Sequence, residues 1–424
     1  MDRDQLHRLS KGELVELVLK LQRPAKTSHT SSTPPSQDKK ERRDKAKPGG
    51  AKPGHKGHFR ALHETPDEVT NHRPDMCPHC QARLESAVGT VIGEYDEIEL
   101  PQLKPFVRRH RRFAVICPQC CARTKAPVPS VAKRSPFGPR LHGLALYLKS
   151  FHSVSFARLE SLFCDVFGLE LSQGALANML RRGHRPFHKG KRKIIRRLRR
   201  AEMVASDETG IRIEGLNGYH WVFLSGSEVV HEAQLSRAAQ VVRDVMGGHK
   251  PAVWLSDGYS AQAGHGHHHQ TCLAHLARDV AYGLEASEDD TPFRLKLWLD
   301  KLFALARSIG TYADSTLKVK KRQLDNMLAD ILLARPTCEV AGTLRAKFAR
   351  ASPQLLTFLD FPGEVEVTNN ACERALRPAV IQRKNTNGFR SMWAAKGDCA
   401  VRTVTDTARL SGQTPFQTII ATLT

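Results

Sequence analysis

The sequence predicts a multidomain α/β protein, and three features of its 424 residues lead to that fold class. The length corresponds to two to four domains at roughly 100–200 residues each. Short apolar runs alternate with turns over residues 203–255, which is typical of buried strands. Stretches with helical spacing precede and follow this region, and residues 24–60 form a Ser-, Pro- and Lys-rich break near the N-terminus.

The composition is strongly basic, with a formal net charge of +22 and an isoelectric point of about 9.8. This excess indicates a polyanionic partner, and nucleic acid is the leading candidate. The chain has no run of about 18 apolar residues, which argues against a membrane span. Its first residues lack the apolar core of a signal peptide. The ten cysteines are therefore expected in a reducing compartment, as metal ligands or core residues rather than disulfides.

Residues 1–23 predict an N-terminal helix. Ser10 and Glu13 have the spacing of a capping box. An apolar stripe follows, formed by Leu14, Leu17, Val18 and Leu21. The stripe fits either a surface helix packed on its own chain or a short coiled coil that pairs protomers. Residues 24–60 predict a disordered basic linker, whose cations could lie along DNA phosphates.

Residues 61–135 predict a zinc ribbon, because two Cys-x-x-Cys motifs together supply four thiolates. The expected ligands of one structural zinc ion are Cys77, Cys80, Cys117 and Cys120. The runs 90–92 and 113–116 are expected to be strands of the ribbon. The alternative is a pair of turns with free thiols. Cys121 is a spare thiol and His79 could compete as a ligand, so the fourth ligand stays open.

Residues 136–200 predict a helical region that ends in a basic run. A helix over 155–167, a turn, and a second helix over 173–182 capped by Ser172 have the order of a helix-turn-helix. An ordinary helical hairpin fits the same pattern. The run that follows holds many cations and no acid, so we expect contact with the DNA backbone rather than only a solvated face. The expected contacts are Lys191, Arg192, Lys193, Arg196 and Arg197.

Residues 201–424 predict the domain that carries the chemistry. The expected elements are strands within 203–213, 219–224 and 228–231 in an antiparallel meander, a helix over 238–246 and a strand over 252–255. This is the order found at the start of RNase H-like folds, in which the first and fourth strands are neighbours. The stretch 280–362 is expected to be an all-helical insertion, and 400–423 a closing helix pair.

Three acids in this domain are placed to bind divalent metal. Asp207 and Asp257 each follow an apolar run, and Glu373 lies on an expected helix among basic residues. Carboxylates suit Mg²⁺ and Mn²⁺, and two such ions can activate the attacking oxygen and stabilise the leaving one. The alternatives are turn roles for the aspartates and a capping box for Glu373. Glu208 is expected on the opposite face of the strand from Asp207.

Several separate motifs occur in one order along the chain. They are the Leu-rich start, the Lys-Pro-Gly-Gly…Gly-His-Lys-Gly linker, the paired Cys-x-x-Cys motifs, Ser206-Asp-Glu-Thr209, Asp257-Gly-Tyr259, Cys272-Leu-Ala-His275 and Asn369-Asn-Ala-Cys-Glu-Arg374. With these motifs the chain resembles transposases of the insertion sequence 66 family. The resemblance implies a DDE transposase with an RNase H-like catalytic domain, in which Asp207, Asp257 and Glu373 are the triad. The family often has Asp before the Asn-Asn pair, where this chain has Thr368.

The implied function is transposition of the chain's own element by metal-dependent phosphoryl transfer. Cleavage at the ends of the insertion sequence would be followed by joining of the 3′-hydroxyl ends to target DNA. The cations expected to position phosphates are Arg374, Arg377, Arg383 and Lys384. The rival functions are a non-catalytic DNA-binding regulator and a metal-dependent nuclease without strand transfer.

The expected partners are element and target DNA, further copies of the chain bound to that DNA, and accessory transposition proteins. The expected location is the bacterial cytoplasm, at the nucleoid. Cys272 and His275 recur after the second aspartate in related transposases, and their plain interpretation is a buried junction between a strand and a helix. Residues 265–269 are expected to be an exposed polar loop rather than a metal site.

Overall fold

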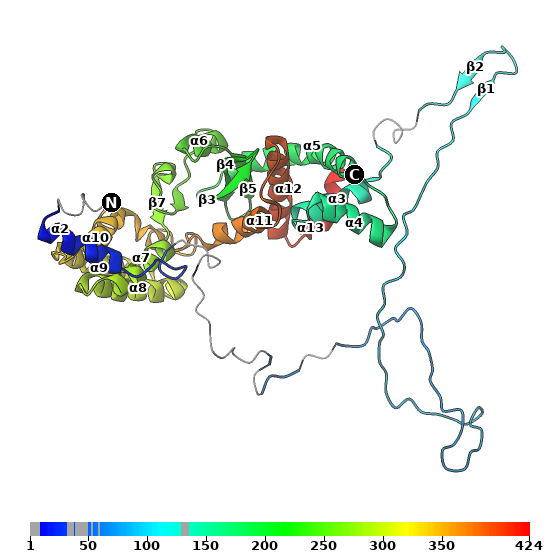
Figure 1. Ribbon diagram of the computed structural model, residues 1–424, viewed down its shortest axis with the longest axis horizontal. Coiled ribbons are helices and arrows are strands. Elements are labelled where there is room, and N and C mark those ends of the chain that lie inside the picture. Colours follow the sequence, from blue (N-terminus) through cyan, green and yellow to red (C-terminus); the bar gives the residue numbers. More distant parts are fainter. Residues whose placement is uncertain (1–8, 32–37, 39–49, 52–53, 58–59, 129–134) are drawn as a thin grey trace. The chain divides into compact units, whose positions relative to one another are not determined.

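The computed structural model describes residues 9–31, 38, 50–51, 54–57, 60–128 and 135–424 (Figure 1). The chain divides into two compact units, Lys40–Val107 and a larger one that joins Met1–Lys39 to Arg108–Thr424. Much of the expected linker lies outside the described residues, as do residues 129–134 at the end of the expected ribbon. Within the described part, no helix is long and apolar enough to span a membrane.

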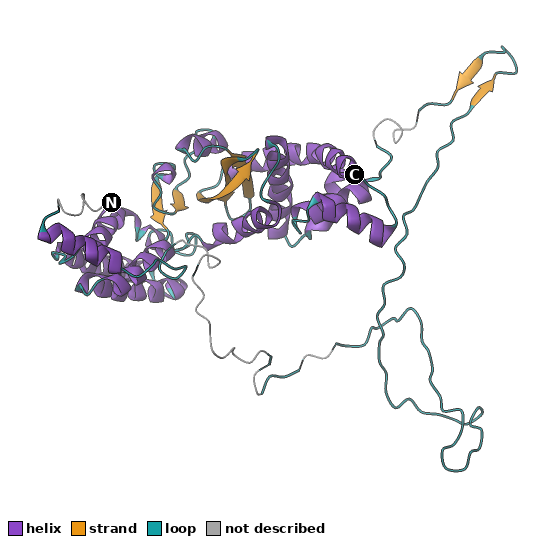
Figure 2. Cartoon of the chain, viewed as in Figure 1, coloured by secondary structure: helices purple, strands orange, loops and turns teal. Residues whose placement is uncertain are grey.

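The larger unit contains a mixed five-stranded sheet, drawn as orange arrows in Figure 2. Its strands are β3 (Met203–Ile213), β4 (Leu216–Leu224), β5 (Val229–Gln234), β6 (Val253–Ser256) and β7 (His268–Thr271). Their order across the sheet is β5-β4-β3-β6-β7. The first three strands form antiparallel pairs, whereas β6 pairs in parallel with both β3 and β7. The expected meander is confirmed, and so is the pairing of the first strand with the fourth.

The β3–β4 hairpin is the longest paired segment of this sheet. Its loop consists of Glu214 and Gly215, whose φ angles are both positive, 55° and 79°. This is the backbone of a two-residue type I′ turn, whose twist matches that of the flanking strands. The structure differs from the sequence pattern in one respect, because β3 runs unbroken from Met203 to Ile213. The polar residues between the two apolar runs stay in the strand because β4 supplies their hydrogen-bond partners.

The edge strand β7 corrects part of the expectation of an exposed loop over residues 265–269, because residues 265–267 do form a loop. His268 and His269 lie in this strand, and the next two residues, Gln270 and Thr271, are buried. No apolar alternation marks the segment, so its sequence gives no strand signal. Pairing with β6 and contact with the helices that follow hold it in place.

Different helices cover the two faces of the sheet. They are α5 (Gln173–Leu198), α6 (Ala239–Met246), α11 (Asn370–Thr386) and α12 (Met392–Leu410). On one face, Val204 and Trp254 pack with apolar residues of α5 and α6. On the other, Ala205 and Leu255 pack with residues of α11. Successive side chains of a strand point to opposite faces. The side chains at every second position after Ala205 and Leu255 therefore lie on the face that α11 covers.

A second helical part combines helices that precede the sheet in sequence with the C-terminal helix. Its helices are α3 (Pro139–Ser150), α4 (Phe156–Phe167), the first half of α5, and the C-terminal helix α13 (Pro415–Leu423). Ser155 and Ser172 cap α4 and α5, and Gly168 ends α4 in the left-handed region. Both expected helices are therefore present. The second one is longer than expected, because α5 continues to Leu198 and carries most of the basic run on its own surface.

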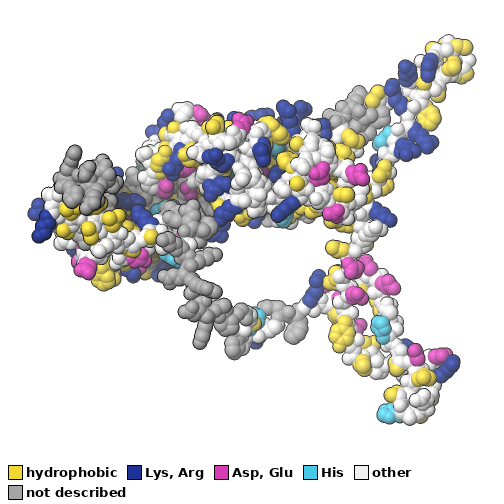
Figure 3. All heavy atoms as spheres, viewed as in Figure 1, with side chains coloured by type: hydrophobic (Ala, Val, Ile, Leu, Met, Phe, Trp, Pro, Cys, Tyr) yellow, Lys and Arg dark blue, Asp and Glu magenta, His cyan; other side chains and the backbone are white. Residues whose placement is uncertain are grey.

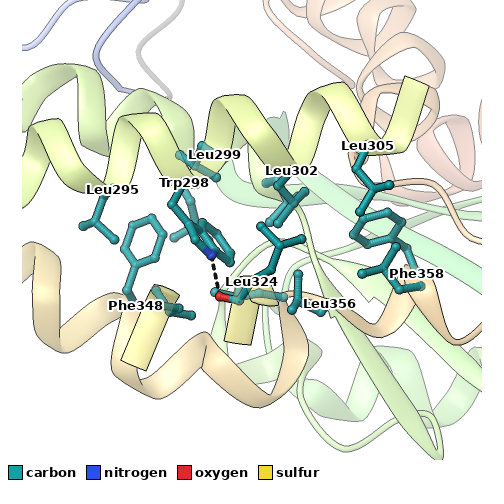
Figure 4. Packing of buried hydrophobic residues seen from close by; sticks show 14 of the residues in the cluster. Leu295, Trp298, Leu299, Leu302, Leu305, Leu324, Phe348, Leu356 and Phe358 are labelled. Atoms are coloured by element: carbon teal, nitrogen blue, oxygen red, sulfur yellow. Dashed lines mark hydrogen bonds between the residues drawn. The ribbon is translucent and has the colours of Figure 1, made fainter. Parts of the chain in front are cut away.

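Between β7 and α11 the chain is helical, as expected. The helices are α7 (Leu273–Ala286), α8 (Asp290–Arg307), α9 (Asp314–Leu333) and α10 (Glu339–Ala351). Figure 4 shows their shared core, in which Trp298 stacks among leucines and donates its indole N–H to the carbonyl of Leu324 at 2.8 Å. The last of these helices ends at Ala351, before the end of the expected helical stretch at 362. Ser352–Gln354 forms a 3₁₀ turn instead, because Pro353 cannot continue the α-helical hydrogen bonds.

The N-terminal helix α2 spans Lys11–Gln22 and begins with the expected capping box between Ser10 and Glu13. Further along, β1 (Ala114–Ile116) and β2 (Arg123–Lys125) form a two-stranded antiparallel ribbon. The expected strand over 113–116 is thus present from Ala114. The one predicted over 90–92 is not, because those residues have no regular secondary structure.

Candidate active site

The two aspartates lie at matching places on neighbouring parallel strands. The last paired positions of β3 and β6 are Ala205 and Leu255. Asp207 and Asp257 each come two residues later, so the alternation of side chains directs both toward the face that α11 covers. Asp257 directly follows the end of β6, and its carboxylate accepts a hydrogen bond from the N–H of Tyr259 at 3.0 Å.

Helix α11 brings the third acid to the same face. Cys372 and Leu376 anchor this helix in the core formed with Ala205 and Leu255. Glu373 follows Cys372, in the first turn of the helix. The capping-box alternative does not describe this residue. The N-cap is Asn369, no side chain caps the helix, and the Glu373 carboxylate accepts a hydrogen bond from Arg278 instead.

The charges of neighbouring acids act on Asp207. Burial raises the pKa of the Asp207 carboxyl well above its usual value, and the neighbouring charges of Glu208 and Asp257 raise it further. The N–H of Glu208 donates to this carboxylate at 2.9 Å and lowers the pKa. The charge of Glu373 raises the pKa by a smaller amount. A partly buried carboxylate with acidic neighbours needs a cation nearby to stay charged.

Four hydrogen bonds tie the acid-bearing segments together at this edge. Asn369, at the start of α11, donates its side-chain amide to the carbonyl of Ser206 at 2.8 Å and its backbone N–H to the Cys272 sulfur at 3.1 Å. The N–H of Cys272 in turn donates to the carbonyl of Ser256 at 2.8 Å. The fourth bond joins Leu273 to Val367 at 3.0 Å. Ser206 and Ser256 directly precede the two aspartates, so these bonds fix the three acids relative to one another.

Helix α7 contributes two further side chains. Arg278 donates to the Glu373 carboxylate at 3.1 Å, and His275 Nε2 lies 3.9 Å from the same oxygen, Oε1. Burial lowers the pKa of His275, and the Arg278 charge lowers it further. Neutral His275 leaves its Nδ1 buried without a hydrogen-bond partner.

Glu208 is buried, with a side chain that is only 1 % exposed. Arg237 pairs with it at 2.6 Å, and the Gln262 amide donates to it at 2.7 Å. The Arg237 guanidinium also stacks over the ring of Tyr259, 3.9 Å from the centroid. Glu208 therefore holds the segment that follows Asp257, although it lies on the strand next to Asp207.

One of the predicted DNA contacts is corrected by the structure. Lys191 is buried on the apolar stripe of α5 that also carries Phe187, Ile194 and Leu198. It forms an ion pair with Glu232 at 2.6 Å and also donates to a β5 carbonyl, so it stabilises the domain and does not face solvent. Arg383 donates to the carbonyl of Gly210 on β3 but is only partly buried, so its predicted role stays a prediction.

Other predicted DNA contacts do face solvent. These exposed cations are Arg192, Lys193, Arg196, Arg197, Arg374, Arg377 and Lys384. One of them, Arg197, also pairs with Glu228 at 2.9 Å. Lys and Arg side chains are spread over much of the face of the larger unit that Figure 3 shows. The exposed members of the predicted set therefore stay candidates for contact with DNA phosphates.

The cysteine motifs adopt one local fold twice. In the first, the N–H of Cys77 donates to the Ala82 carbonyl and the N–H of Gln81 donates to the Cys77 carbonyl, both at 2.9 Å. The second repeats these bonds at the same lengths, from Cys117 to Ala122 and from Cys121 to Cys117. In each turn, backbone N–H groups that point at the first thiol lower its pKa. Such turns fit thiolate ligands of a metal.

The three acids and the two cysteine motifs differ in how they could bind a metal ion. The carboxylates of Asp207, Asp257 and Glu373 form the hard oxygen donor set that Mg²⁺ and Mn²⁺ prefer. Among the described residues, no group of three or more His, Cys, Asp or Glu side chains is arranged to hold a metal ion. The first cysteine motif belongs to the smaller unit and the second to the larger.

Sequence reasoning missed the residues that connect the acids. Asn369 gives no signal of its own, because its partner Ser206 lies far away in sequence. Arg278 could have been found, since it lies three residues after His275 on a helix and therefore on the same face.

Comparison with known families agrees with this arrangement. The family described as Transposase IS66 family matches residues 134–397, more than half of the chain, and the matched region contains all three acids. A comparison with curated proteins finds no match. Membership in a transposase family implies DNA as the partner of this basic protein. The chain belongs to the Transposase IS66 family.

Proposed function

We propose that this protein is a DDE transposase that cleaves the ends of its insertion sequence and joins the 3′-hydroxyl ends to target DNA. The observation that carries the proposal is the convergence of Asp207, Asp257 and Glu373 on one face of the sheet. Strand order β5-β4-β3-β6-β7, with α11 across the face that bears the aspartates, supports an RNase H-like assignment of the domain. The helices between β7 and α11 would then be an insertion into it.

The roles of the three acids follow from their positions. Two Mg²⁺ or Mn²⁺ ions bound there would supply activation of the attacking oxygen and stabilisation of the leaving one. Asp207 and Asp257, at matching places on neighbouring strands, are proposed to share the ions. Glu373 would complete the second site. The bonds from Asn369 to Ser206 and from Cys272 to Ser256 would hold these carboxylates at a fixed spacing.

DNA binding is assigned to surfaces outside the acids. The exposed cations of α5 would contact phosphates without reading sequence, because charge contacts to the backbone are the same for every base pair. Arg374 and Arg377 are exposed on α11, one and four residues beyond Glu373, and would hold phosphates close to the acids. The four thiolates of the Cys-x-x-Cys motifs stay the predicted ligands of one structural zinc ion.

The test is a strand-joining assay with DNA that carries the element's ends, Mg²⁺ or Mn²⁺ and a target plasmid. The proposal expects cleaved ends and joined products, and the loss of both in Asp207→Asn, Asp257→Asn and Glu373→Gln. Cleavage without joining would favour the nuclease. DNA binding without cleaved or joined products, with the three variants behaving like the wild type, would favour the regulator.

A further inference from the structure

Arg278 forms an ion pair with a proposed metal ligand. Its guanidinium lies 3.1 Å from Oε1 of Glu373, and the two side chains are 26 % and 31 % exposed. Among the described residues, Glu373 is the one carboxylate within salt-bridge distance of Arg278. The neighbouring acid on the helix, Asp279, is paired with Lys347 of α10. If Glu373 turned to a metal ion, no adjacent carboxylate would take its place beside Arg278.

The ion pair is not needed to join α7 to α11. The start of α7 is already held to the segment before α11 by the backbone bond from Leu273 to Val367, and Asn369 binds the sulfur of Cys272. A half-exposed pair of this kind contributes at most about 1 kcal/mol to stability. Its position at the acid cluster therefore calls for an explanation other than packing.

A metal ion and Arg278 would compete for the same oxygen. A guanidinium displaced from Glu373 would stay in a partly buried place with an unpaired charge, which is unfavourable. In a transposase, the phosphate of a bound DNA strand is the available anion. The planar guanidinium can bind a phosphate through a bidentate hydrogen-bonded contact.

We propose that Arg278 is a further catalytic residue that exchanges partners. It holds Glu373 before a divalent ion binds, and it contacts a DNA phosphate at the acid cluster once Glu373 ligates the ion. This inference rests on the proposed function of Asp207, Asp257 and Glu373. No covalent bond forms or breaks at Arg278, which supplies positive charge and two hydrogen-bond donors to the phosphate.

Two measurements on the full-length protein test both halves of the exchange. The first is Mn²⁺ binding without DNA, followed by electron paramagnetic resonance of the free ion. In Arg278→Gln the competitor is gone, so Mn²⁺ should bind about two- to fivefold more tightly, the equivalent of a surface ion pair. The second is the rate of end cleavage at saturating Mn²⁺. That rate should fall by about 100-fold, the usual cost of losing one charge-stabilising donor.

Two further variants separate this role from a structural one. Arg278→Lys keeps the charge, so its Mn²⁺ affinity should stay near that of the wild type while its cleavage rate is partly restored. Lys347→Gln breaks the neighbouring ion pair, between α10 and Asp279 of α7, and should change neither quantity. Thermal unfolding of each variant identifies any that is misfolded, and Arg278→Lys then carries the comparison alone.

The outcomes separate a failure of this inference from a failure of the proposed function on which it rests. If Asp207→Asn cleaves DNA at the wild-type rate, the two-metal function itself is wrong. If Asp207→Asn is inactive but Arg278→Gln binds Mn²⁺ no more tightly than the wild type, or cleaves normally at saturating Mn²⁺, then the role of Arg278 is overturned while the triad stands.

Discussion

The acid cluster and the cysteine turns are assembled in opposite ways. Each cysteine turn is made by backbone bonds within six consecutive residues, such as Cys77–Ala82. The acids come from segments separated by as many as 166 positions, Asp207 to Glu373, and are aligned by the sheet register and by bonds through Asn369 and Cys272. A local turn can form wherever its sequence occurs. The acid cluster exists only in the folded domain, so it should respond to changes at residues that never touch a metal.

The largest expected effect is on the chemistry at the acids themselves. Asp207→Asn keeps the shape of the side chain but removes its charge, so the rate of end cleavage should fall by roughly a thousandfold, the upper range for losing one electrostatic stabiliser. Binding of end-containing DNA, measured by gel shift, should stay within about twofold, because the exposed cations of α5 are unchanged. Equal loss of binding and cleavage would contradict this assignment.

A large effect on stability is expected from the buried cation of α5. Lys191→Met leaves Glu232 without its partner in a mostly buried place, so the free energy of unfolding should drop by about 3 kcal/mol. Replacing the exposed neighbours Arg192, Lys193 and Arg196 with Gln should leave stability nearly unchanged. That triple variant should instead reduce the salt dependence of DNA binding, by about one unit of slope for each phosphate that the protein no longer neutralises.

Denaturant unfolding and salt-dependent binding of these two variants form a matched pair. The expectation is contradicted if Lys191→Met unfolds like the wild type and loses DNA binding, since Lys191 would then face the DNA as the sequence pattern indicates.

A smaller change should show that the acids depend on a distant bond. Asn369→Ala removes the donor to the buried Ser206 carbonyl, so the free energy of unfolding should fall by about 1–3 kcal/mol. It should also weaken Mn²⁺ binding and slow cleavage by about ten- to a hundredfold, as loss of an outer-shell partner usually does. Gln413→Ala, at an exposed position beside α13, is the control. Stability loss with unchanged Mn²⁺ affinity would show that Asn369 supports the fold alone.

The cysteine turns should behave independently of the acid cluster. One zinc per chain is expected in protein purified without chelator, measured by elemental analysis, and Cys77→Ser or Cys117→Ser should each abolish it. Because the turns are local, neither change should alter Mn²⁺ binding at the acids. Full zinc content in Cys117→Ser would show that the two motifs do not share one ion.

The same contrast explains what could be predicted from sequence. The strands and the helices that flank them carry apolar periodicity. Their order, the neighbouring first and fourth strands and the capping of α5 by Ser172 were therefore predictable. β7 was not, because its His-His-Gln-Thr sequence has no apolar signal and it forms only against β6. The burial of Lys191 was predictable in principle, since it falls four residues after Phe187 on the apolar stripe. The pairing of Glu373 with Arg278 was not, because it depends on how α7 and α11 meet.

The smallest expected effect is a pH-dependent gain of stability when Asp207 is neutralised. Burial first, and then the charges of Glu208 and Asp257, raise the pKa of this carboxyl in the folded protein. The folded state therefore retains a proton that the unfolded state has lost above about pH 4, so this group lowers stability as pH rises through its folded pKa. Asp207→Asn lacks that penalty. Without added divalent metal it should melt a few degrees above the wild type at pH 7.5 and at the same temperature at pH 4, a difference that thermal unfolding resolves. Saturating Mn²⁺ should raise the melting temperature of the wild type at pH 7.5 but not that of the variant, because a ligand stabilises only the state that binds it. A constant difference between the two proteins at both pH values would mean that the Asp207 carboxylate is not electrostatically strained.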